Sequence, residues 1–328
     1  MNAPPLEVVE NAVTLAGHAP SLHNSQPWRW SYDGTALRLF AVTGRELPST
    51  DIAGRQLLIS CGVVLDHLRT AMAATGWRSW VSRFPDPNRR DHLATVEFRP
   101  VASVTDRGRD RAEAIARRRT DRLPLAAPAD WDRAELVVRA ALDPDGAVLD
   151  VLPDDSRGQL VHASELAAEA RGREPGYRAE LLWWTGHAAE SIGIPPEVLT
   201  TGQEGARVGI GRELPTVDRD SRRMDIDTDH SAVLVLSTEN DSSQQLLRCG
   251  ESLSTVLLEC TVAGYATCPL THLTELPRSR AIVSRLTGRA MLPQVLVRVG
   301  TAPGTSDAPP ATPRLALEDI FEIRRPGR

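Results

Sequence analysis

The sequence predicts an α+β protein made of two related halves, each with a central antiparallel or mixed sheet and helices packed around it. Three observations predict this class: an internal repeat, β-rich runs bounded by turn residues, and apolar helix patterns between those runs. The chain has 328 residues, of which 41% are hydrophobic and 25% are charged. These values are typical of a soluble protein with one large or two ordinary domains.

The repeat relates residues 56–77 to residues 244–265 at a constant offset of 188. The identical pairs are Gln56 and Gln244, Leu58 and Leu246, Cys61 and Cys249, Gly62 and Gly250, Leu65 and Leu253, and Gly76 and Gly264. Both segments carry apolar residues at alternating spacings of three and four, which is one face of a buried helix. Since any two buried helices share that spacing, the matched Cys-Gly pair is the stronger evidence for a duplication. The ordinary role of both cysteines is core packing, with glycine allowing a close backbone approach.

The other elements follow from turn signals and periodicity. The Asp33-Gly34 pair between two β-rich runs predicts a hairpin. Strands are expected at 28–32, 35–42, 95–101, 147–152, 232–237 and 294–299. Helices are expected at 6–17, 53–75, 110–119, 131–142, 158–171, 244–263 and 278–287. Residues 207–212 and 268–272 are expected to be turns or loops, and residues 300–313 an exposed arm.

Composition excludes several function classes. The formal net charge of −5 argues against nucleic-acid binding, which needs a basic face. Four cysteines without a C-x-x-C pair favour a reducing cytoplasm. We expect no membrane partner, because the N-terminus does not resemble a signal peptide and no window is expected to reach the length of a membrane span. The sequence has no metal-ligand spacing, no G-x-G-x-x-G after a strand and no P-loop. All 38 basic residues are arginine, so a bound phosphate would need guanidinium groups, backbone N–H groups or hydroxyls.

A polar loop follows the first predicted helix. Ser21, Asn24 and Gln26 offer hydroxyl and amide groups between Pro20 and Pro27, which stiffen the loop. Such a loop suits a flat ligand rich in heteroatoms. The alternative is a turn that is capped by its own serine and asparagine side chains.

Two further segments carry candidate binding groups. Arg118, Thr120 and Arg122 alternate, so in an extended segment two guanidinium groups and a hydroxyl face one way and could hold a phosphate. The alternative is a solvated charged surface. Residues 268–272, which follow Gly264, could lay their backbone along the edge of a planar ring, although alone they indicate only a loop.

Together the three segments resemble the FMN-binding nitroreductase superfamily, most closely its Acg-type branch, from about residue 5 to residue 322. APSLHNSQPW is similar to the family's A-P-S-x-x-N-x-Q-P-W, and residues 118–122 resemble its phosphate-binding R-x-S-x-R with Thr120 in place of serine. GYATCPLTH resembles the segment that lays a Pro-x-Glu-Gly backbone along the flavin, with Thr271-His272 in place of Glu-Gly. PRLALEDI resembles the closing segment, and Arg314 matches its phosphate-binding basic residue.

The resemblance implies a nitroreductase-like fold and bound FMN. The family's usual members are homodimers with FMN between subunits, so this chain resembles a fused dimer with halves at residues 1–110 and 111–328. The first half would supply the P-S-x-x-N loop, and the second half the phosphate clamp and the flavin-face loop. The implied FMN-binding residues are Pro20, Ser21, Leu22, Asn24, Gln26, Arg118, Thr120, Arg122, Pro269, Leu270, Thr271, His272 and Arg314. One complete site and one degenerate site are expected, in a monomer that acts as a fused dimer or associates further into a homodimer.

The resemblance also implies an activity. Hydride would pass from NADH or NADPH through FMN to a nitroaromatic, a quinone or a similar small acceptor, with the Thr271 N–H beside the flavin N5. No side chain would act as nucleophile or general base, and no metal is needed. The long polar stretch at residues 186–230 could form a lid over the flavin. This lid and the Thr-His substitution leave open a low-turnover protein that binds, sequesters or senses flavin. The third alternative is an unrelated enzyme in which the arginine-rich residues 117–122 form only a solvated surface.

Overall fold

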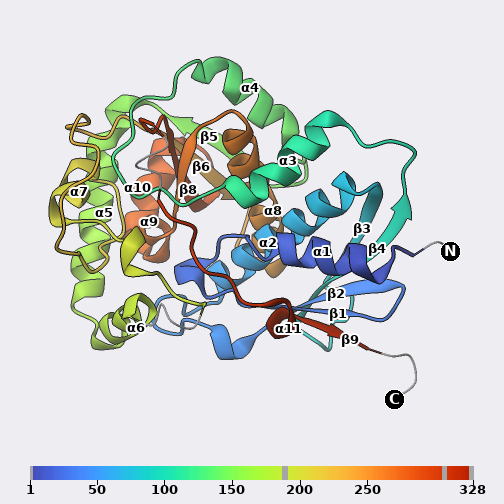
Figure 1. The fold of residues 1–328 in the computed structure, drawn as a ribbon. Helices are drawn as coiled ribbons and strands as arrows, with labels where there is room; N and C mark the ends of the chain where they lie inside the picture. Colours follow the sequence, from blue (N-terminus) through green and yellow to red (C-terminus); the bar gives the residue numbers. More distant parts are fainter. Residues whose placement is uncertain (1–2, 187–190, 305–308, 325–328) are drawn as a thin grey trace.

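The computed structural model describes residues 3–186, 191–304 and 309–324, which form two sheets on either side of a central helix pair (Figure 1). The first sheet has the order β3-β4-β2-β1-β9, with β1 (Trp28–Tyr32), β2 (Ala36–Ala41), β3 (Trp77–Arg83), β4 (His92–Pro100) and β9 (Phe321–Ile323). The second has the order β5-β6-β8-β7, with β5 (Val148–Leu152), β6 (Ala232–Thr238), β7 (Ala266–Leu270) and β8 (Leu292–Gly300). All neighbours are antiparallel except β1 and β9, so the α+β class with antiparallel and mixed sheets is confirmed.

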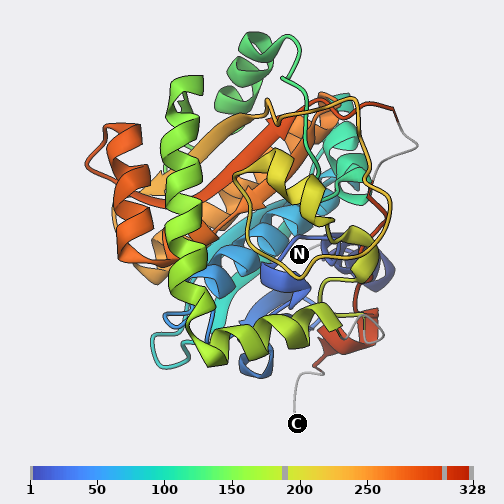
Figure 2. The same ribbon diagram turned by 90° about the vertical axis from the view of Figure 1, so that its left-hand side faces the viewer.

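Helices pack around both sheets (Figure 2). They are α1 (Leu6–Ala16), α2 (Arg55–Ala74), α3 (Asp106–Arg117), α4 (Trp131–Ala141), α5 (Arg157–Gly172), α6 (Pro175–Gly186), α7 (Gly202–Val208), α8 (Ser243–Val262), α9 (His272–Glu275), α10 (Pro277–Thr287) and α11 (Leu317–Ile320). Each of the seven helices predicted from the sequence is present within a few residues of its expected bounds.

The structure confirms the internal duplication. The antiparallel strand orders β3-β4-β2-β1 and β7-β8-β6-β5 are the same, and α2 precedes β3 as α8 precedes β7. The two repeated helices touch at their matched glycines. A Cβ on Gly62 would lie 2.0 Å from the Leu247 carbonyl oxygen, and a Cβ on Gly250 would lie 2.0 Å from that of Ile59. Because Ile59 and Leu247 are also 188 residues apart, this contact is symmetric.

One hydrophobic core spans both halves. It includes Trp28 and Leu65 from the first half and Leu253 and Val297 from the second, all nearly inaccessible to solvent. The boundary proposed at residue 110 falls inside α3, and β9 from the end of the chain pairs in parallel with β1. The two halves therefore share one core, and the second half contributes strand β9 to the sheet of the first.

Several elements differ from the sequence-based expectations. No strand is predicted at β3, β7 or β9, and no helix at α6, α7, α9 or α11. Strands β3 and β7 mix polar residues with tryptophan or proline and hold few β-branched residues, so neither shows a clear strand pattern. The predicted turn at 207–212 contains the end of α7, and the predicted loop at 268–272 contains the end of β7 and the start of α9. Helix α3 begins at Asp106, where the Thr105 side chain caps it by accepting from the Gly108 N–H at 3.1 Å. It ends at Arg117, which leaves Arg118 and Arg119 in extended chain.

Helix α2 corrects a further expectation. By length and composition it could cross a membrane, although no window was expected to do so. In the fold 72% of that window is buried, and α2 packs against α8. Its apolar character is therefore that of a core helix.

Candidate functional site

The polar loop at residues 20–26 adopts an unusual backbone. His23, Asn24 and Gln26 have φ values of 49°, 58° and 48°, in the left-handed region that costs free energy for residues other than glycine. The Ser21 hydroxyl accepts from the Gln26 N–H at 2.9 Å, so the turn is partly capped by its own serine, as the alternative interpretation expected. Backbone strain of this kind indicates a loop that is held in place by its contacts.

The amide side chains of this loop hold the C-terminal arm. Asn24 Nδ2 donates to the Pro313 carbonyl at 3.1 Å, and the Leu315 N–H donates to Gln26 Oε1 at 3.0 Å. Gln26 Nε2 donates to the Ser191 carbonyl at 2.8 Å. Gln26 is fully buried and lines neither of the two cavities described below. Gln26 binds Leu315 and Asn24 binds Pro313, so the two amide side chains together fix the chain on either side of Arg314. A direct contact of Gln26 with a ligand stays a prediction.

Two arginines meet beside this loop. Arg118 Nη2 and Arg314 Nη2 donate to the same carbonyl, that of His18, at 3.4 and 3.2 Å. Arg118 is only 4% exposed, and within the described ranges its Nε and Nη1 atoms and the Nε of Arg314 have no hydrogen-bond partner. No ion pair to either arginine occurs in that part of the chain. Burial, and for Arg118 the nearby Arg314, lowers the pKa of both guanidinium groups. The pair thus lacks a counter-anion.

A small cavity of about 50 Å³ lies against these arginines. It is lined by His18, Pro20, Ser21, Asn24, Arg118, Arg119, Thr120, Arg122, Ile194, Val198, Ala311, Thr312 and Arg314. Seven of the predicted site residues meet here, although they come from three distant parts of the sequence. Unpaired buried guanidinium donors around a small space fit a phosphate group.

The clamp segment is extended because it lies along the edge of β7. Thr120 forms a parallel bridge with Thr267, and the Asp121 N–H donates to the Thr267 carbonyl at 2.8 Å. Alternate side chains therefore face the same way, and Arg118, Thr120 and Arg122 all reach the small cavity. The alternative of a solvated arginine run does not hold for Arg118, which is buried.

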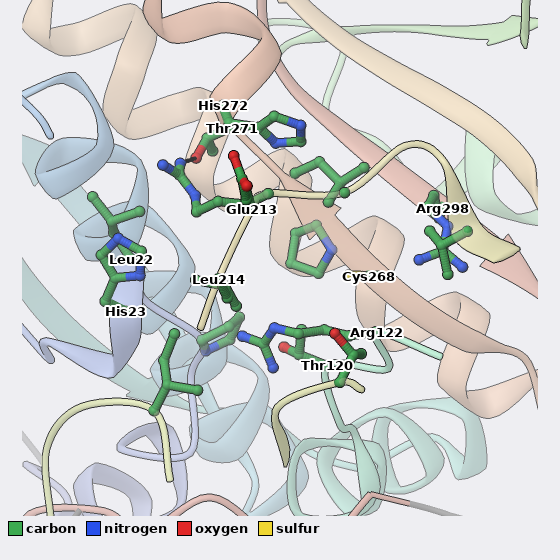
Figure 3. A pocket seen from close by; sticks show the side chains of 18 of the residues that line it. Leu22, His23, Thr120, Arg122, Glu213, Leu214, Cys268, Thr271, His272 and Arg298 are labelled. Carbon is green, nitrogen blue, oxygen red and sulfur yellow. Dashed lines mark hydrogen bonds between the residues drawn. The ribbon is translucent and has the colours of Figure 1, made fainter. Parts of the chain in front are cut away.

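A larger cavity of about 430 Å³ continues from the small one (Figure 3). Among its walls are the predicted residues Pro20, Ser21, Leu22, Thr120, Arg122, Pro269, Leu270, Thr271 and His272. Pro20, Ser21, Thr120 and Arg122 line both cavities. The volume lies within the range of roughly 300–1,000 Å³ found for small-molecule and cofactor sites.

A buried polar network fixes Thr271. Its hydroxyl donates to Gln56 Oε1 at 2.7 Å, and Gln56 Nε2 donates to Glu275 Oε1 at 2.8 Å. Arg212 forms an ion pair with Glu275 and donates to the Thr271 hydroxyl at 3.1 Å. Burial alone would raise the pKa of Glu275, but the Arg212 guanidinium outweighs it and lowers the pKa to about 2. The carboxylate therefore stays ionised beside the cavity.

His272 is a neutral imidazole. The Ser164 hydroxyl lies 2.9 Å from His272 Nε2 and donates to the Gly211 carbonyl at 3.1 Å, so Nε2 carries the proton that the hydroxyl accepts. Nδ1 is then a bare acceptor, without a partner within the described ranges. Burial, reinforced by Arg212, lowers the pKa of His272 to about 3. Where the family pattern has glycine, the chain thus presents an uncharged imidazole.

The segment from residue 191 to 230, here called the covering segment, forms one wall of the larger cavity. Thr200, Gly205, Gly209 and Arg212 are among the residues that it contributes. Two buried ion pairs clamp it to the site: Arg212 with Glu275, and Arg223 with Asp121 through bonds of 2.6 and 3.1 Å. Residues 187–190 of the predicted lid lie outside the described residues.

A side chamber of about 350 Å³ adjoins the larger cavity between α5, α6 and residues 212–215. Both spaces include His272 and Arg212 in their walls. In the described part of the chain, no group of His, Cys, Asp or Glu side chains is arranged to hold a metal ion.

The equivalent positions around β3 carry an ion cluster. At the offset of 188, Glu251 stands where the larger cavity has Val63, and Arg83 where it has Thr271. Arg83 donates to Glu251 through bonds of 2.6 and 2.7 Å, and Arg69 adds a third at 2.9 Å. Beside β3 an ion cluster thus stands where the cavity beside β7 has an apolar side chain and a hydroxyl.

Sequence reasoning missed the network of Gln56, Arg212 and Glu275. The only available signal was the match of Gln56 with Gln244 in the repeat. Arg212 lies in a segment that is expected to be a turn, and Glu275 lies between the expected loop at 268–272 and the expected helix at 278–287, so nothing local connects them.

Comparison with known proteins gives close relatives of nearly full length. No family model matches the chain. An uncharacterized protein of Mycobacterium tuberculosis (strain H37Rv) is 50% identical over 322 residues, which are 97% of this chain and 94% of that protein. The protein named "Putative NAD(P)H nitroreductase acg" from the same strain is 49% identical over 318 residues, which are 97% of this chain and 96% of that protein. Among solved structures, the FMN-dependent nitroreductase NfnB from Mycobacterium smegmatis in complex with NADPH aligns with a TM-score of 0.43 at 17% identity, covering 67% of this chain and 100% of that one.

Proposed function

The chain belongs to the nitroreductase family of the Mycobacterium tuberculosis acg protein, and from that premise we propose that it is an FMN-binding oxidoreductase of nitroreductase type. Reduced nicotinamide, NADH or NADPH, would be the electron donor. A small nitroaromatic, quinone or similar molecule would be the acceptor. The relatives' names support the nicotinamide, and the site supports the flavin.

The observation that carries the proposal is the pair of uncompensated guanidinium groups at the small cavity. Arg118 and Arg314 have buried, unpartnered N–H groups and no carboxylate nearby within the described ranges. A phosphate would supply the missing charge and acceptors, with the Thr120 hydroxyl as a further donor. The adjoining cavity of about 430 Å³ offers room for a ring system attached to that phosphate. The residues present therefore fit FMN.

When bound, FMN would supply hydride acceptance and donation, which no protein side chain provides. The chain's own residues bind and orient. Pro20, Ser21 and Leu22 form one wall, Pro269 and Leu270 the opposite one, and the network of Gln56 and Glu275 holds Thr271 in place. With His272 neutral, no protonated imidazole stands beside the cavity near pH 7.

Titration of the FMN-free protein with FMN and with riboflavin tests the phosphate site. We expect FMN to bind about 100-fold more tightly, because two charge-assisted hydrogen bonds are together worth about 3 kcal/mol. Arg118→Gln should lose most of this preference. It should also raise the stability of the flavin-free protein, because it removes an unpaired buried charge. Arg117→Gln is the matched control, since Arg117 is exposed at the end of α3.

Equal affinity for FMN and riboflavin would refute the phosphate site. A protein that takes up no flavin at all would refute the proposed cofactor. If flavin binds, anaerobic addition of NADPH or NADH should bleach its visible absorbance.

A second candidate function is flavin binding with little turnover, for storage, sequestering or sensing. The covering segment favours it, because the ion pairs of Arg212 and Arg223 clamp that segment over the cavity. The two functions differ in one readout. A protein that sequesters flavin would keep its absorbance in the presence of NADPH but lose it with a small chemical reductant such as dithionite.

A further inference from the structure

The duplication makes β3 and β7 equivalent edge strands, but only one of them is covered. Ser79 in β3 lies 188 residues before Thr267 in β7. On the outer edge of β7, Thr120 bridges Thr267 in parallel and the Asp121 N–H donates to the Thr267 carbonyl at 2.8 Å. Residues 118–122 thus act as a short extra strand on that edge.

The corresponding edge of β3 is open. Within the described ranges β3 pairs only with β4, and its other edge has no strand partner. A groove of about 530 Å³ runs there, between α2, residues 101–108 and the loop at 143–145. The Ser79 hydroxyl is buried in this groove without a hydrogen-bond partner in the described part of the chain. By equivalence with Thr267, the backbone N–H and carbonyl of Ser79 point outward, and such an edge is a template for strand addition.

The exposed side chains of this edge are aromatic and cationic. The guanidinium carbons of Arg78 and Arg99 each lie 5.0 Å from the centre of the Trp80 ring, which is 41% exposed. Neither arginine takes part in an ion pair among the described residues. At the far wall, where Asp143 and Asp145 also lie, Arg248 donates to the Asp145 carbonyl at 3.3 Å and lies 3.9 Å from its carboxylate. Strand β3 itself carries arginine and no acidic residue, on a protein whose net charge is −5.

We propose that the β3 edge binds an acidic, extended segment of a partner protein by strand addition, parallel to β3 as residues 120–121 lie parallel to β7. The backbone of the added strand pairs with Ser79, and its acidic side chains meet Arg78 and Arg99. A second copy of this chain suits the edge poorly, because two such edges would place arginines against each other. The site shares no lining residue with the larger cavity, so it is independent of flavin binding.

Binding of a synthetic peptide to the full-length protein tests the charge requirement. The probe is a fluorescein-labelled nine-residue peptide of alternating glutamate and valine, followed by fluorescence anisotropy. We expect it to bind, and the double variant Arg78→Glu/Arg99→Glu to weaken binding at least tenfold. Arg278→Glu/Arg285→Glu makes the same charge change on exposed positions of α10 and should leave binding unchanged. Absence of binding, or equal losses in the two double variants, overturns the proposal.

Strand pairing is tested separately. Ser79→Pro removes the outward N–H, and edge strands accept proline at such positions. It should abolish binding, whereas Ser79→Ala should retain it. Should the proline variant fail to fold, hydrogen exchange of the wild type replaces it: the peptide should slow exchange at Ser79 and Val81. A second peptide with the same charges but proline at every second position cannot pair as a strand. If it binds as tightly as the first peptide, binding is electrostatic adsorption and the proposal is overturned. Peptide-sensitive dimers in sedimentation would identify a second copy as the occupant and also overturn it.

Discussion

The two sides of the α2–α8 pair carry the same scaffold and opposite arrangements of charge. Beside β7, Arg118 and Arg314 are buried around the small cavity, and in the described part of the chain neither arginine has a carboxylate partner. Beside β3, Arg83 and Arg69 converge on Glu251 and form an ion cluster. The strand order and the glycine contact are common to both sides, so the difference lies in the side chains and in residues 118–122 and 191–230, which line the cavity only on the β7 side.

Two substitutions at equivalent positions account for much of that difference. Glu251 replaces Val63 and Arg83 replaces Thr271, which together introduce a buried ion pair where the other side has an apolar wall and a hydroxyl. An uncompensated buried cation is costly unless an anion joins it, whereas a paired one needs no further partner. The comparison teaches that the duplicated scaffold does not determine the number of binding sites. One flavin per chain is our expectation.

The largest effect is predicted where the two sides meet. Gly62→Ala should cost about 3 kcal/mol or more, or prevent folding, because the new Cβ would lie 2.0 Å from the Leu247 carbonyl oxygen and the helices must separate. Gly250→Ala should cost about the same, since its contact with Ile59 is the mirror of the first. Chemical denaturation of both variants measures this.

Gly158→Ala is the matched control for these variants. Gly158 lies in α5 and a Cβ there would meet nothing within 4 Å, so alanine should be neutral or stabilise by about 0.5–1 kcal/mol through helix propensity. Unequal effects of Gly62→Ala and Gly250→Ala would show that the helix contact is less symmetric than the backbone.

The next prediction concerns the ion cluster beside β3. Glu251→Gln should destabilise the protein by about 3 kcal/mol, because it leaves Arg83 and Arg69 close together without their shared carboxylate. Neutralising Arg118 beside the small cavity should act in the opposite direction in the flavin-free protein. Thermal unfolding of the two variants side by side measures both signs. Destabilisation by both changes would mean that Arg118 already has an anionic partner.

Much of the scaffold and most of the site could be predicted, because their signals are local. The hairpin follows from Asp33-Gly34, and the duplication from the matched Cys-Gly pair. The phosphate clamp could be predicted because successive side chains of an extended segment point to opposite sides, which places Arg118 and Arg122 on the same side. These features depend on neighbouring residues, so they required no knowledge of the tertiary fold.

The missed features depend on contacts between distant segments. The Gln26 amide bonds to Ser191 and Leu315, and no sequence pattern connects these three residues. The ion pair of Arg212 with Glu275 joins two segments that carried no periodic signal. Strand β3 alternates tryptophan and serine with arginine, so its pattern gave no clear β-branched run.

A smaller effect is expected at the clamp of the covering segment. Arg212→Met removes the ion pair to Glu275 and the bonds to Thr271 and Tyr177, and should lower stability by about 2 kcal/mol. For each 1.4 kcal/mol by which the variant destabilises the closed segment relative to an open form, the population of that open form would rise about tenfold. Stopped-flow measurement of flavin bleaching by NADPH should show a faster rate. Arg219→Gln is the control, because among the described residues Arg219 bonds only to the carbonyls of Glu197 and Leu199 in its own segment. An unchanged rate in Arg212→Met would separate the clamp from access to the flavin.

The smallest effect is expected at the contact between α2 and α8, here called the helix seam. At this seam α2 carries His67, and the equivalent position of α8 carries Thr255. The Ser254 hydroxyl donates to Asp66 at 2.7 Å and lies 2.8 Å from His67 Nδ1, so it accepts the Nδ1 proton and Nε2 stays bare and buried. Burial lowers the pKa of His67 well below its ordinary value of 6.5. The unfolded chain therefore takes up the proton first, and the stabilisation, complete above pH 6.5, is lost as the pH falls below it.

One such histidine should cost about 1 kcal/mol of unfolding free energy between pH 6.5 and 5.5. His23 and His272 should act in the same direction, since burial lowers their pKa values as well. Urea denaturation at both pH values, for the wild type and for His67→Gln, isolates the contribution of the helix seam: the variant should lose about 1 kcal/mol less on acidification. An identical pH dependence in the two proteins would mean that His67 is protonated in the fold with Nε2 bonded to an ordered water, and the asymmetry of the helix seam would then have no effect on stability.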